Sequence, residues 1–371
     1  MINQLSNNKK LDSPAADNDR HLQQPNLNND NSQYLEIARI SGLAEHTNCM
    51  VSNNQPSKIT GSSIVYLGSQ KHTKLQKDGS IRTIEGQLFI YDLGEPASPV
   101  LLSSIRLDIK DMQLAGQWLI TASVSGLISI LDISDPFEPA IVLEHQYSAR
   151  INKLLLESTD NIEQVPTLFV QSFDRGYSQI DLFALPNNLR VGENIKISNH
   201  ASAMTSLNYW NATSGREKRY FCYAEAQRLR IALVNAKTQK FEIQAHLEIM
   251  FGSHISALAS SDNKILVGTR DGRLRSFSFT DENGLNGFES PNRSNNDIRL
   301  NSPITSIVVN GAIASVVTLD GVNLIDISNA KQLVKRQSIV SESPVVNVNV
   351  VNDLLLVKDL KGLSLYQIPL T

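Results

Sequence analysis

The sequence of 371 residues predicts an all-β protein, a seven-bladed β-propeller whose last blade is completed by an outer strand from near the N-terminus. Three observations lead to this prediction. Short apolar runs occur without helical periodicity, seven turn positions recur 40 to 51 residues apart, and the final repeat lacks an outer strand.

The repeated unit is clearest in the stretch GLISILDISDPFEPAIVLEHQY, which runs from Gly126 to Tyr147. It contains a strand-like run, a turn rich in Asp and Pro, and a second strand-like run. A period of this size, with about four short strands in each unit, is typical of a propeller blade. A tight hairpin between the two middle strands favours a positive φ, which glycine adopts readily. The turn positions are Gly86, Gly126, Gly176, Gln227, Gly272, Gly321 and Gly362.

Each unit divides into four strands, which we call a to d in chain order. Strand a is expected at residues 255–261, 305–311 and 345–352, and strand b at residues 264–269 and 353–359. Strand c, as in LISILDI, is apolar on both faces. This pattern predicts a sheet that is covered by a neighbouring blade on each side.

The two ends of the chain differ from the repeats. The last unit ends at Thr371, directly after its strand c, and residues 34–41 (YLEIARIS) resemble an outer strand without a blade. We expect this segment to complete blade seven, since an open ring would leave an unpaired sheet edge. Residues 1–32 are rich in Asn and poor in apolar residues, so we predict a disordered tail before a propeller of residues 33–371.

Composition narrows the range of functions. The net charge of -3 and the pI of about 6.2 argue against a general nucleic-acid binder. Cys49 and Cys222 are far apart and lack CxxC spacing, so we expect two buried free thiols. No apolar run approaches the ~20 residues of a membrane-spanning helix. The N-terminus lacks the apolar core of a signal peptide, and the sequence therefore predicts a cytoplasmic protein without a transmembrane segment.

Acidic residues recur just after strand c, at Asp92, Asp132 and Asp326. Their repetition favours a turn-forming role over a catalytic one. We expect Asp132 or Asp135 to accept backbone N–H bonds in an Asx-type turn before the outer strand.

GLISILDISDPFEP closely resembles the LVIVD repeat, in which a strand ending in Asp precedes Ile-Ser-Asp-Pro and a further proline. GVNLIDISNAKQL and LFIYDLGEPASPV share parts of that pattern. The fifth unit is more similar to a WD-repeat, with Thr269 and Asp271 at its strand-b hydroxyl and turn aspartate and Phe277 replacing its tryptophan. The resemblance implies a seven-bladed propeller. Because LVIVD-type propellers are often exported, it also gives an exported or envelope-associated protein as the alternative location.

Loops between strands d and a, and between strands b and c, share one face of a propeller around its central channel. The position just before strand a should ring the mouth of this channel. In WD-repeat proteins, which the fifth unit resembles, this position is a frequent partner contact. It is occupied by His46, Lys110, Arg150 and His254 in four units and by Ala203, Pro303 and Pro344 in the other three.

The first b–c loop, from residue 69 to residue 86, is unusually long and should rise from the same face. It carries Lys71, His72, Lys74, Lys77 and Arg82 against the acids Asp78 and Glu85. We therefore expect a locally basic face. Asp174 and Arg175, in the third b–c turn, should lie on this face as a solvated pair, whereas the polar loops 157–166, 211–218 and 280–296 should lie on the opposite face.

No sequence motif of a nucleophile, a nucleotide site or a metal site is present, so no cofactor is predicted. The leading hypothesis is a non-enzymatic scaffold that binds a protein or an acidic ligand on the basic face. One alternative is a lyase or hydrolase in the funnel of that face, using His46, His254 or Arg150 beside a metal or a polarised water. Another is a structural part of an assembly, tethered by the tail. The predicted contact residues are His46, Lys110, Arg150, His254, Lys74 and Lys77.

Overall fold

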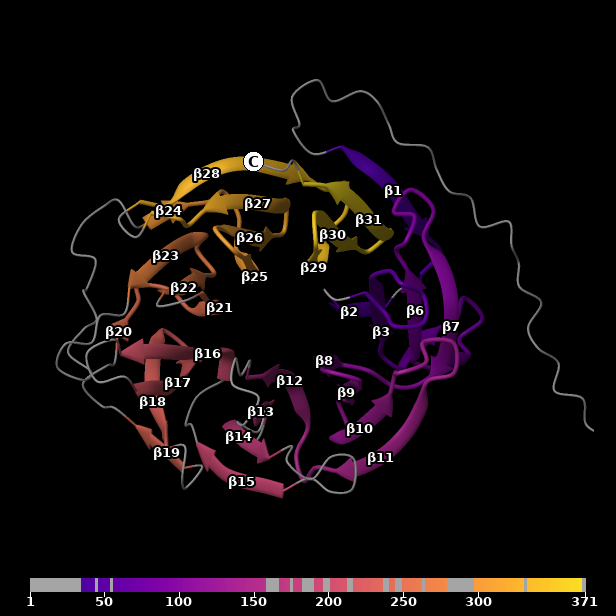
Figure 1. Cartoon of the computed structure of the whole chain (residues 1–371), viewed down its shortest axis with the longest axis horizontal. Coiled ribbons are helices and arrows are strands. Elements are labelled where there is room, and N and C mark those ends of the chain that lie inside the picture. The colour runs from indigo at the N-terminus through magenta and orange to yellow at the C-terminus, as the bar shows by residue number, and fades with distance from the viewer. Residues whose placement is uncertain are drawn as a thin grey trace, which may run out of the picture.

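The structure is a computed structural model, and all its regular elements are β-strands (Figure 1). No helix that could cross a membrane occurs among the described residues. The described residues are 35–43, 46–53, 56–157, 167–173, 176–181, 190–195, 201–211, 216–235, 240–243, 249–261, 264–278, 297–329 and 332–368. The predicted tail 1–32, Asp174, Arg175 and most of the three polar loops lie outside this set.

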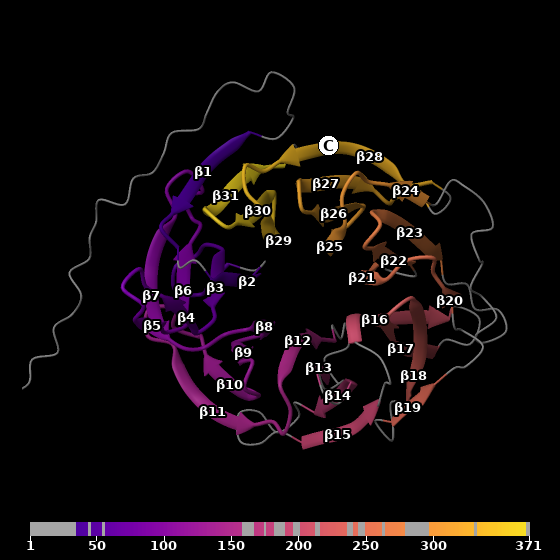
Figure 2. The same cartoon turned by 180° about the vertical axis from the view of Figure 1, so that it is seen from behind.

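Seven antiparallel sheets are arranged radially around one axis, which confirms the seven-bladed propeller (Figures 1 and 2). Blade 1 contains β2 (Thr47–Ser52), β3 (Ile64–Ser69), β6 (Gln87–Asp92) and β7 (Val100–Arg106). Blade 2 contains β8 (Asp111–Ala115), β9 (Trp118–Ala122), β10 (Leu127–Asp132) and β11 (Ala140–Gln146). Blade 3 contains β12 (Ile151–Leu156), β13 (Thr167–Ser172), β14 (Gly176–Asp181) and β15 (Arg190–Ile195). Blade 4 contains β16 (Ala201–Asn211), β17 (Arg216–Glu225), β18 (Arg228–Asn235) and β19 (Lys240–Ile243), and β20 (Ile249–Met250) also pairs with β18.

The remaining blades follow the same order. Blade 5 contains β21 (Ile255–Ser261), β22 (Lys264–Thr269), β23 (Arg273–Ser278) and β24 (Asp297–Arg299), and blade 6 contains β25 (Ile304–Asn310), β26 (Ile313–Thr318), β27 (Gly321–Asp326) and β28 (Val334–Val340). Blade 7 contains β29 (Val345–Val351), β30 (Leu354–Asp359), β31 (Gly362–Gln367) and β1 (Glu36–Ser41). In blade 7, β1 pairs antiparallel with β31, and the Arg39 guanidinium donates to both carboxylate oxygens of Asp359, at 3.0 and 2.8 Å.

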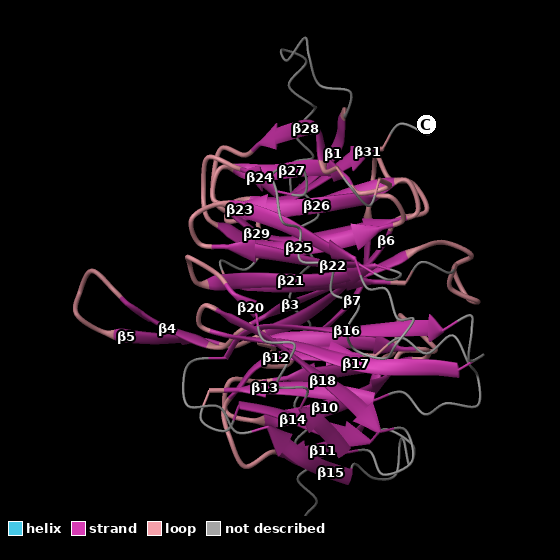
Figure 3. Cartoon of the chain, turned by 90° about the vertical axis from the view of Figure 1, so that its left-hand side faces the viewer, coloured by secondary structure: helices cyan, strands magenta, loops and turns pink. Residues whose placement is uncertain are grey.

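The first strand of each blade lies innermost, and these seven strands contact one another around the axis (Figure 1). We call the end where strand a begins and strand b ends the upper face, and the opposite end the lower face. A two-stranded hairpin, β4 (His72–Leu75) and β5 (Ile81–Ile84), is inserted between β3 and β6 and projects from the upper face (Figure 3).

Hydrophobic residues pack between the blades. Among the described residues, seven buried clusters occur, one at each junction of neighbouring blades. Strand β13 contributes Phe169 to the junction with blade 4, but Leu168 and Val170 to the junction with blade 2. This arrangement explains why the middle strands are apolar on both faces. Cys49 and Cys222 are buried free thiols within such clusters, as predicted.

The turn glycines are required for two reasons, only one of which the sequence indicated. Gly126 has φ +94, as expected of a tight turn. A Cβ at this position would also lie 2.7 Å from Tyr147 O, where the outer strand ends. Gly86 and Gly362 do not have a positive φ, yet a Cβ there would lie 2.6 Å from Leu107 O and 2.5 Å from Ile40 O. Close approach of the outer strand therefore excludes side chains at both positions.

The acids after strand c form turns on the lower face, as predicted. Asp132 Oδ1 accepts from Ser134 N at 2.9 Å, and Asp135 Oδ1 accepts from Phe137 N at 2.9 Å. Asp92 Oδ1 accepts from Gly94 N at 2.6 Å, and Asp326 Oδ1 accepts from Ser328 N at 2.8 Å. These carboxylates are therefore used by their own turns.

Candidate interaction surface

The four predicted ring residues all lie at the upper ends of innermost strands. Each is bonded through its backbone to the end of strand b in its own blade: His46 O accepts from Gln70 N, Arg150 O from Phe173 N and His254 O from Arg270 N. In blade 2, Lys110 N donates to Ala122 O at 2.7 Å. His46, Arg150 and His254 are exposed, whereas Lys110 is half-buried. They therefore belong to blades 1, 2, 3 and 5 of one face.

One position of the predicted ring is wrong. Ala203 is the third residue of β16, and it lies just after the same register shift that follows the first residue of β2, β12 and β21. By this register, residue 200 precedes the strand in blade 4, and it lies outside the described residues. The error arose because the alignment used Met204 and Leu207 as the apolar pair of blade 4, whereas the register places Ala201 and Met204 at the positions of Ile151 and Leu154.

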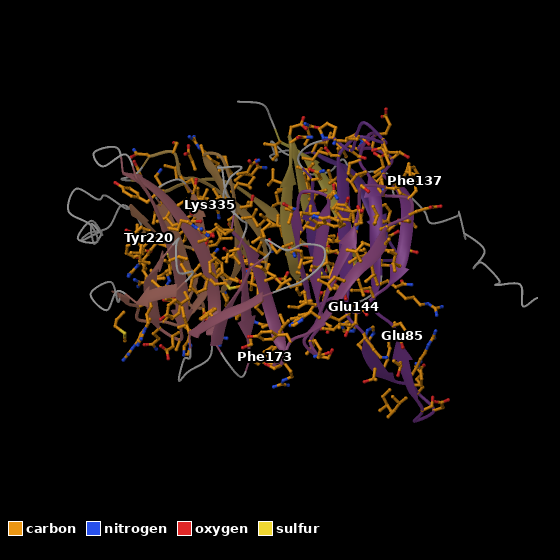
Figure 4. All side chains as sticks on the ribbon, turned by 60° about the horizontal axis from the view of Figure 1, so that its bottom comes forward. Glu85, Phe137, Glu144, Phe173, Tyr220 and Lys335 are labelled. Carbon is orange, nitrogen blue, oxygen red and sulfur yellow. The ribbon has the colours of Figure 1, made fainter. Side chains whose placement is uncertain are left out.

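Two ring residues contact neighbouring rings. The His46 and His72 rings lie 3.6 Å apart between centroids, which places the base of the hairpin against the ring position of blade 1. The Arg150 guanidinium lies 5.3 Å from the centroid of Phe173, within the range of a cation–π contact. In Figure 4, Glu85 and Phe173 lie at the end of the molecule opposite to Phe137.

The hairpin is anchored at its base. Lys71 N donates to Asp108 Oδ1 at 2.7 Å, and Lys71 Nζ pairs with Glu85 at 3.1 Å. Below it, Ser69 Oγ accepts from Gln87 N at 2.8 Å, which closes the end of blade 1 beneath the insertion. The hairpin is therefore an appendage on a complete blade.

The tip of the hairpin is an ordered turn. Gly79 has φ +81, and Asp78 Oδ1 accepts from both the amide and the hydroxyl of Ser80, at 2.9 and 2.7 Å. These bonds lower the pKa of Asp78 below its ordinary value, with the hydroxyl of Ser80 as the main cause. The exposed cations of the hairpin are Lys74 and Arg82 on the strands and Lys77 in the turn.

A second group of cations on the upper face was not among the predicted residues. It spans blades 4 and 5 and contains exposed Arg228, Arg270 and Arg299 and half-buried Arg230, Arg273 and Arg275. Part of its charge is balanced, because Arg273 lies 3.4 Å from Asp271 and Arg275 lies 3.2 Å from Asp297. The sequence carried a signal in the segments RLR (228–230) and RDGRLR (270–275), which flank the b–c turns of these blades.

Exposed apolar side chains accompany these cations. Phe173, Leu319 and Leu360 lie in the b–c turns of blades 3, 6 and 7, and each is about half exposed, between 50 and 53%. Leu75 and Ile81 oppose each other near the tip of the hairpin and are 71 and 73% exposed. The upper face therefore combines cations with apolar side chains, a composition suited to binding an acidic protein surface.

Beneath this variable surface, one buried polar position recurs in every blade. The last residue of strand b, or the residue after it, carries a buried hydroxyl or carboxylate: Ser69, Ser123, Ser172, Glu225, Thr269, Thr318 and Asp359. In blade 5, Thr269 Oγ1 accepts from Arg273 N at 3.1 Å and donates to Asp271 Oδ1 at 2.6 Å, at the two positions that resemble a WD-repeat. Six of these residues bond to the b–c turn of their own blade, and Glu225 pairs with Arg230 at 3.4 Å, so this position serves the fold.

Several reactive side chains are buried away from this surface. Burial raises the pKa of both the Cys49 and the Cys222 thiols, which keeps them protonated at neutral pH. Burial lowers the pKa of Lys358 to about 8, and this ammonium donates to the carbonyl of Asp359. Among the described residues, no group of three His, Cys, Asp or Glu side chains could hold a metal ion. His46 and His254 belong to blades 1 and 5, which are not neighbours in the ring.

Comparisons with known proteins identify the fold. No family model matches the sequence, and no curated protein matches it. The structure is similar to solved propeller structures. The β-propeller domain of Myceliophteria thermophila Cps50 (Swd1) aligns with a TM-score of 0.61 and 12% identity, over 89% of this chain and 98% of that chain.

Two further solved structures give the same result. BBS1N, crystallised in complex with ARL6DN, aligns with a TM-score of 0.62 and 13% identity, over 91% of this chain and 97% of that chain. U3-55K aligns with a TM-score of 0.60 and 11% identity, over 89% and 98%. At these identities the similarity shows the propeller fold alone. The likeness to LVIVD repeats therefore stays a sequence-level resemblance.

Proposed function

We propose that this propeller is a non-enzymatic interaction scaffold that binds an acidic protein or another anionic ligand across its upper face. The observation that carries the proposal is the gathering of cations and exposed apolar side chains at one end of the ring. His46, Arg150 and His254 are exposed on this face, as are Lys74 and Lys77 of the hairpin. Lys110 contributes from blade 2.

Two further observations support the proposal. The charges of the lower-face turns are held by their own turn bonds, whereas the upper-face cations differ from blade to blade and are exposed. One of the structurally similar propellers, BBS1N, was crystallised in complex with another protein. A rigid ring that presents variable side chains is suited to the same kind of use.

The experiment compares two charge-matched variants of the full chain. In the upper-face variant, Lys74→Glu is combined with Arg150→Glu. In the lower-face variant, Lys58→Glu is combined with Lys335→Glu, two exposed lysines at the opposite end. Each variant changes the net charge by the same amount, and each is used to capture proteins from native extract, with quantitative mass spectrometry as the readout.

The upper-face variant should lose about tenfold or more of the partner recovered by the wild type, since electrostatic complementarity sets capture at a charged surface. The lower-face variant should recover the partner normally. Equal recovery with both variants, or a wild type that captures no partner saturably, would contradict the proposal.

A further inference from the structure

The hairpin β4–β5 is separate from the blade that carries it. Ser69 and Gln87 bond to each other beneath the insertion, as the corresponding residues do around the tight b–c turns of other blades. Figure 3 shows the hairpin standing away from the ring. Its presence is therefore not explained by closure of blade 1.

The edges of the hairpin have no strand partner in the part of the chain that the structure describes. Among the described strands, β4 and β5 pair only with each other. A hairpin of two strands is at best marginally stable in water, and a third strand would satisfy the outward-facing N–H and C=O groups of one edge. The hydrogen bond from Lys71 N to Asp108 holds the base of the hairpin, so the orientation of the hairpin on the blade is already set when a third strand is added.

The two faces of the hairpin have different chemistry. Cross-strand pairs His72 with Ile84 and Lys74 with Arg82 share one face, and His72 places that face on the side of His46. Pairs Thr73 with Thr83 and Leu75 with Ile81 share the other face. A strand added to either edge would place alternate side chains beside these two surfaces.

Charge determines which strand fits. Lys74 and Arg82 are directly opposite each other, and like charges in this position destabilise a strand pair. Residues 71–85 carry four cations and two acids, a net charge of +2 within a chain of net charge -3. An acidic strand would relieve the repulsion on the cationic face, whereas a second copy of the same hairpin would add to it.

We propose that the β4–β5 hairpin binds an extended protein segment of alternating acidic and apolar residues as a third strand. This inference rests on the proposed function and names the partner for one part of the upper face. Acidic side chains of the segment would lie beside Lys74 and Arg82, and apolar ones beside Leu75 and Ile81. Main-chain hydrogen bonds provide affinity and the alternation provides specificity.

The test uses a fluorescently labelled peptide of alternating Glu and Val, seven residues long with capped ends, added to the full chain. Three comparison peptides are one in which Lys replaces each Glu, a Glu/Val peptide with N-methylated amides, and a Glu/Val peptide of the same composition in which the Glu and Val residues are grouped in blocks. Fluorescence anisotropy measures affinity. Amide hydrogen exchange measures protection within residues 71–85.

The Glu/Val peptide should bind saturably and protect amides of β4 or β5, whereas each comparison peptide should bind about tenfold more weakly or worse. Lys74→Glu with Arg82→Glu should weaken binding by a similar factor. Replacing residues 71–85 by a short turn should abolish it, and the variant should fold because the blade is complete below Ser69. Equal affinity for the N-methylated peptide, or unchanged binding without the hairpin, would overturn the inference, as would hairpin-dependent dimers of the free chain.

The outcome is distinguishable from that of the proposed function. If the shortened variant still captures its partner from native extract and Arg150→Glu still weakens that capture, the scaffold proposal stands and the strand-addition proposal fails. If the peptide binds the hairpin but Arg150→Glu has no effect on capture of the partner from native extract, the strand-addition proposal stands and the ring residues are not part of the binding surface.

Discussion

The lower and upper faces of the propeller use charged residues in opposite ways. On the lower face, Asp92, Asp132 and Asp326 recur at one position and accept bonds from the turns that follow them. On the upper face, exposed His46, Arg150 and His254 occupy one position in some blades, while Pro303 and Pro344 occupy it in others. A charge that repeats with the blade is used by the fold, whereas the exposed upper-face residues that vary between blades are the ones we propose for partner binding.

The largest expected effect on stability comes from removing one partner of a buried ion pair. Glu157 and Arg219 form an ion pair between blades 3 and 4, and both are almost fully buried. Arg219→Met should lower the free energy of unfolding by about 3–5 kcal/mol, because it leaves a buried carboxylate unpaired. Denaturant unfolding measures the loss.

The matched control for this pair is the double variant Glu157→Gln with Arg219→Met, which should recover a large part of the stability. If the free energy of unfolding of Arg219→Met lies within about 1 kcal/mol of the wild-type value, the ion pair is solvated rather than buried.

The next effect concerns the recurring buried position of the upper face. Asp359→Asn should cost about 2 kcal/mol, because Asp359 accepts from Arg39 and from the amides of Lys361 and Gly362. Burial alone would raise the pKa of Asp359, but the bonds from Arg39 and these amides hold it below its ordinary value. The carboxylate therefore stabilises the fold above its unfolded pKa of about 4, and this contribution is lost as the pH falls through the folded pKa.

Unfolding measured at pH 7 and near pH 3 should show a smaller difference between Asp359→Asn and the wild type at the lower pH. Asp320→Asn, an exposed acid in the equivalent turn of blade 6, should change stability by less than about 0.5 kcal/mol at either pH. Equal effects of the two variants would remove the distinction between buried and exposed acids in these turns.

A smaller effect is expected on the lower face. Asp326→Ala should cost about 1 kcal/mol, because the amide of Ser328 and the guanidinium of Arg336 lose their acceptor. Hydrogen bonds, first of all from Ser328, lower the pKa of Asp326 to about 2, so its contribution should disappear as the pH falls from about 4 to about 2. Thermal unfolding across this range measures it, and any loss of partner binding in this variant would contradict a purely structural role.

The smallest effect on stability is expected at the ring. Arg150→Glu should lower the free energy of unfolding by less than about 1 kcal/mol, because the guanidinium is exposed and its contact with Phe173 is a surface cation–π contact. The same change should weaken partner capture. A variant that unfolds markedly more easily would instead place Arg150 among the residues that hold the fold.

Much of the architecture could be predicted because it depends on local patterns. The spacing of the turn positions predicted seven blades, and runs such as LISILDI indicated sheets covered on both faces. The turn acids were recognised because they repeat. The reason for Gly86 and Gly362 could not be predicted, since it lies in the approach of strands from other parts of the chain.

The candidate site was less predictable. The position before strand a was placed correctly in every blade except blade 4, where Met204 and Leu207 were aligned in place of Ala201 and Met204. The arginines of blades 4 and 5 were missed because Arg228 and Arg299 are 71 residues apart, and only the ring brings their blades together. The two faces of the hairpin depend on a strand register that a loop sequence does not specify.

By itself, the sequence determined the number of blades, the order of strands and the residues that form the turns, because a 40- to 51-residue period and local alternation encode them. Only the tertiary structure decided which charges share a face and which are buried. Arg39 meets Asp359, and Glu157 meets Arg219, across long stretches of chain. These contacts depend on how the blades pack around the axis, and no local sequence pattern specifies that packing.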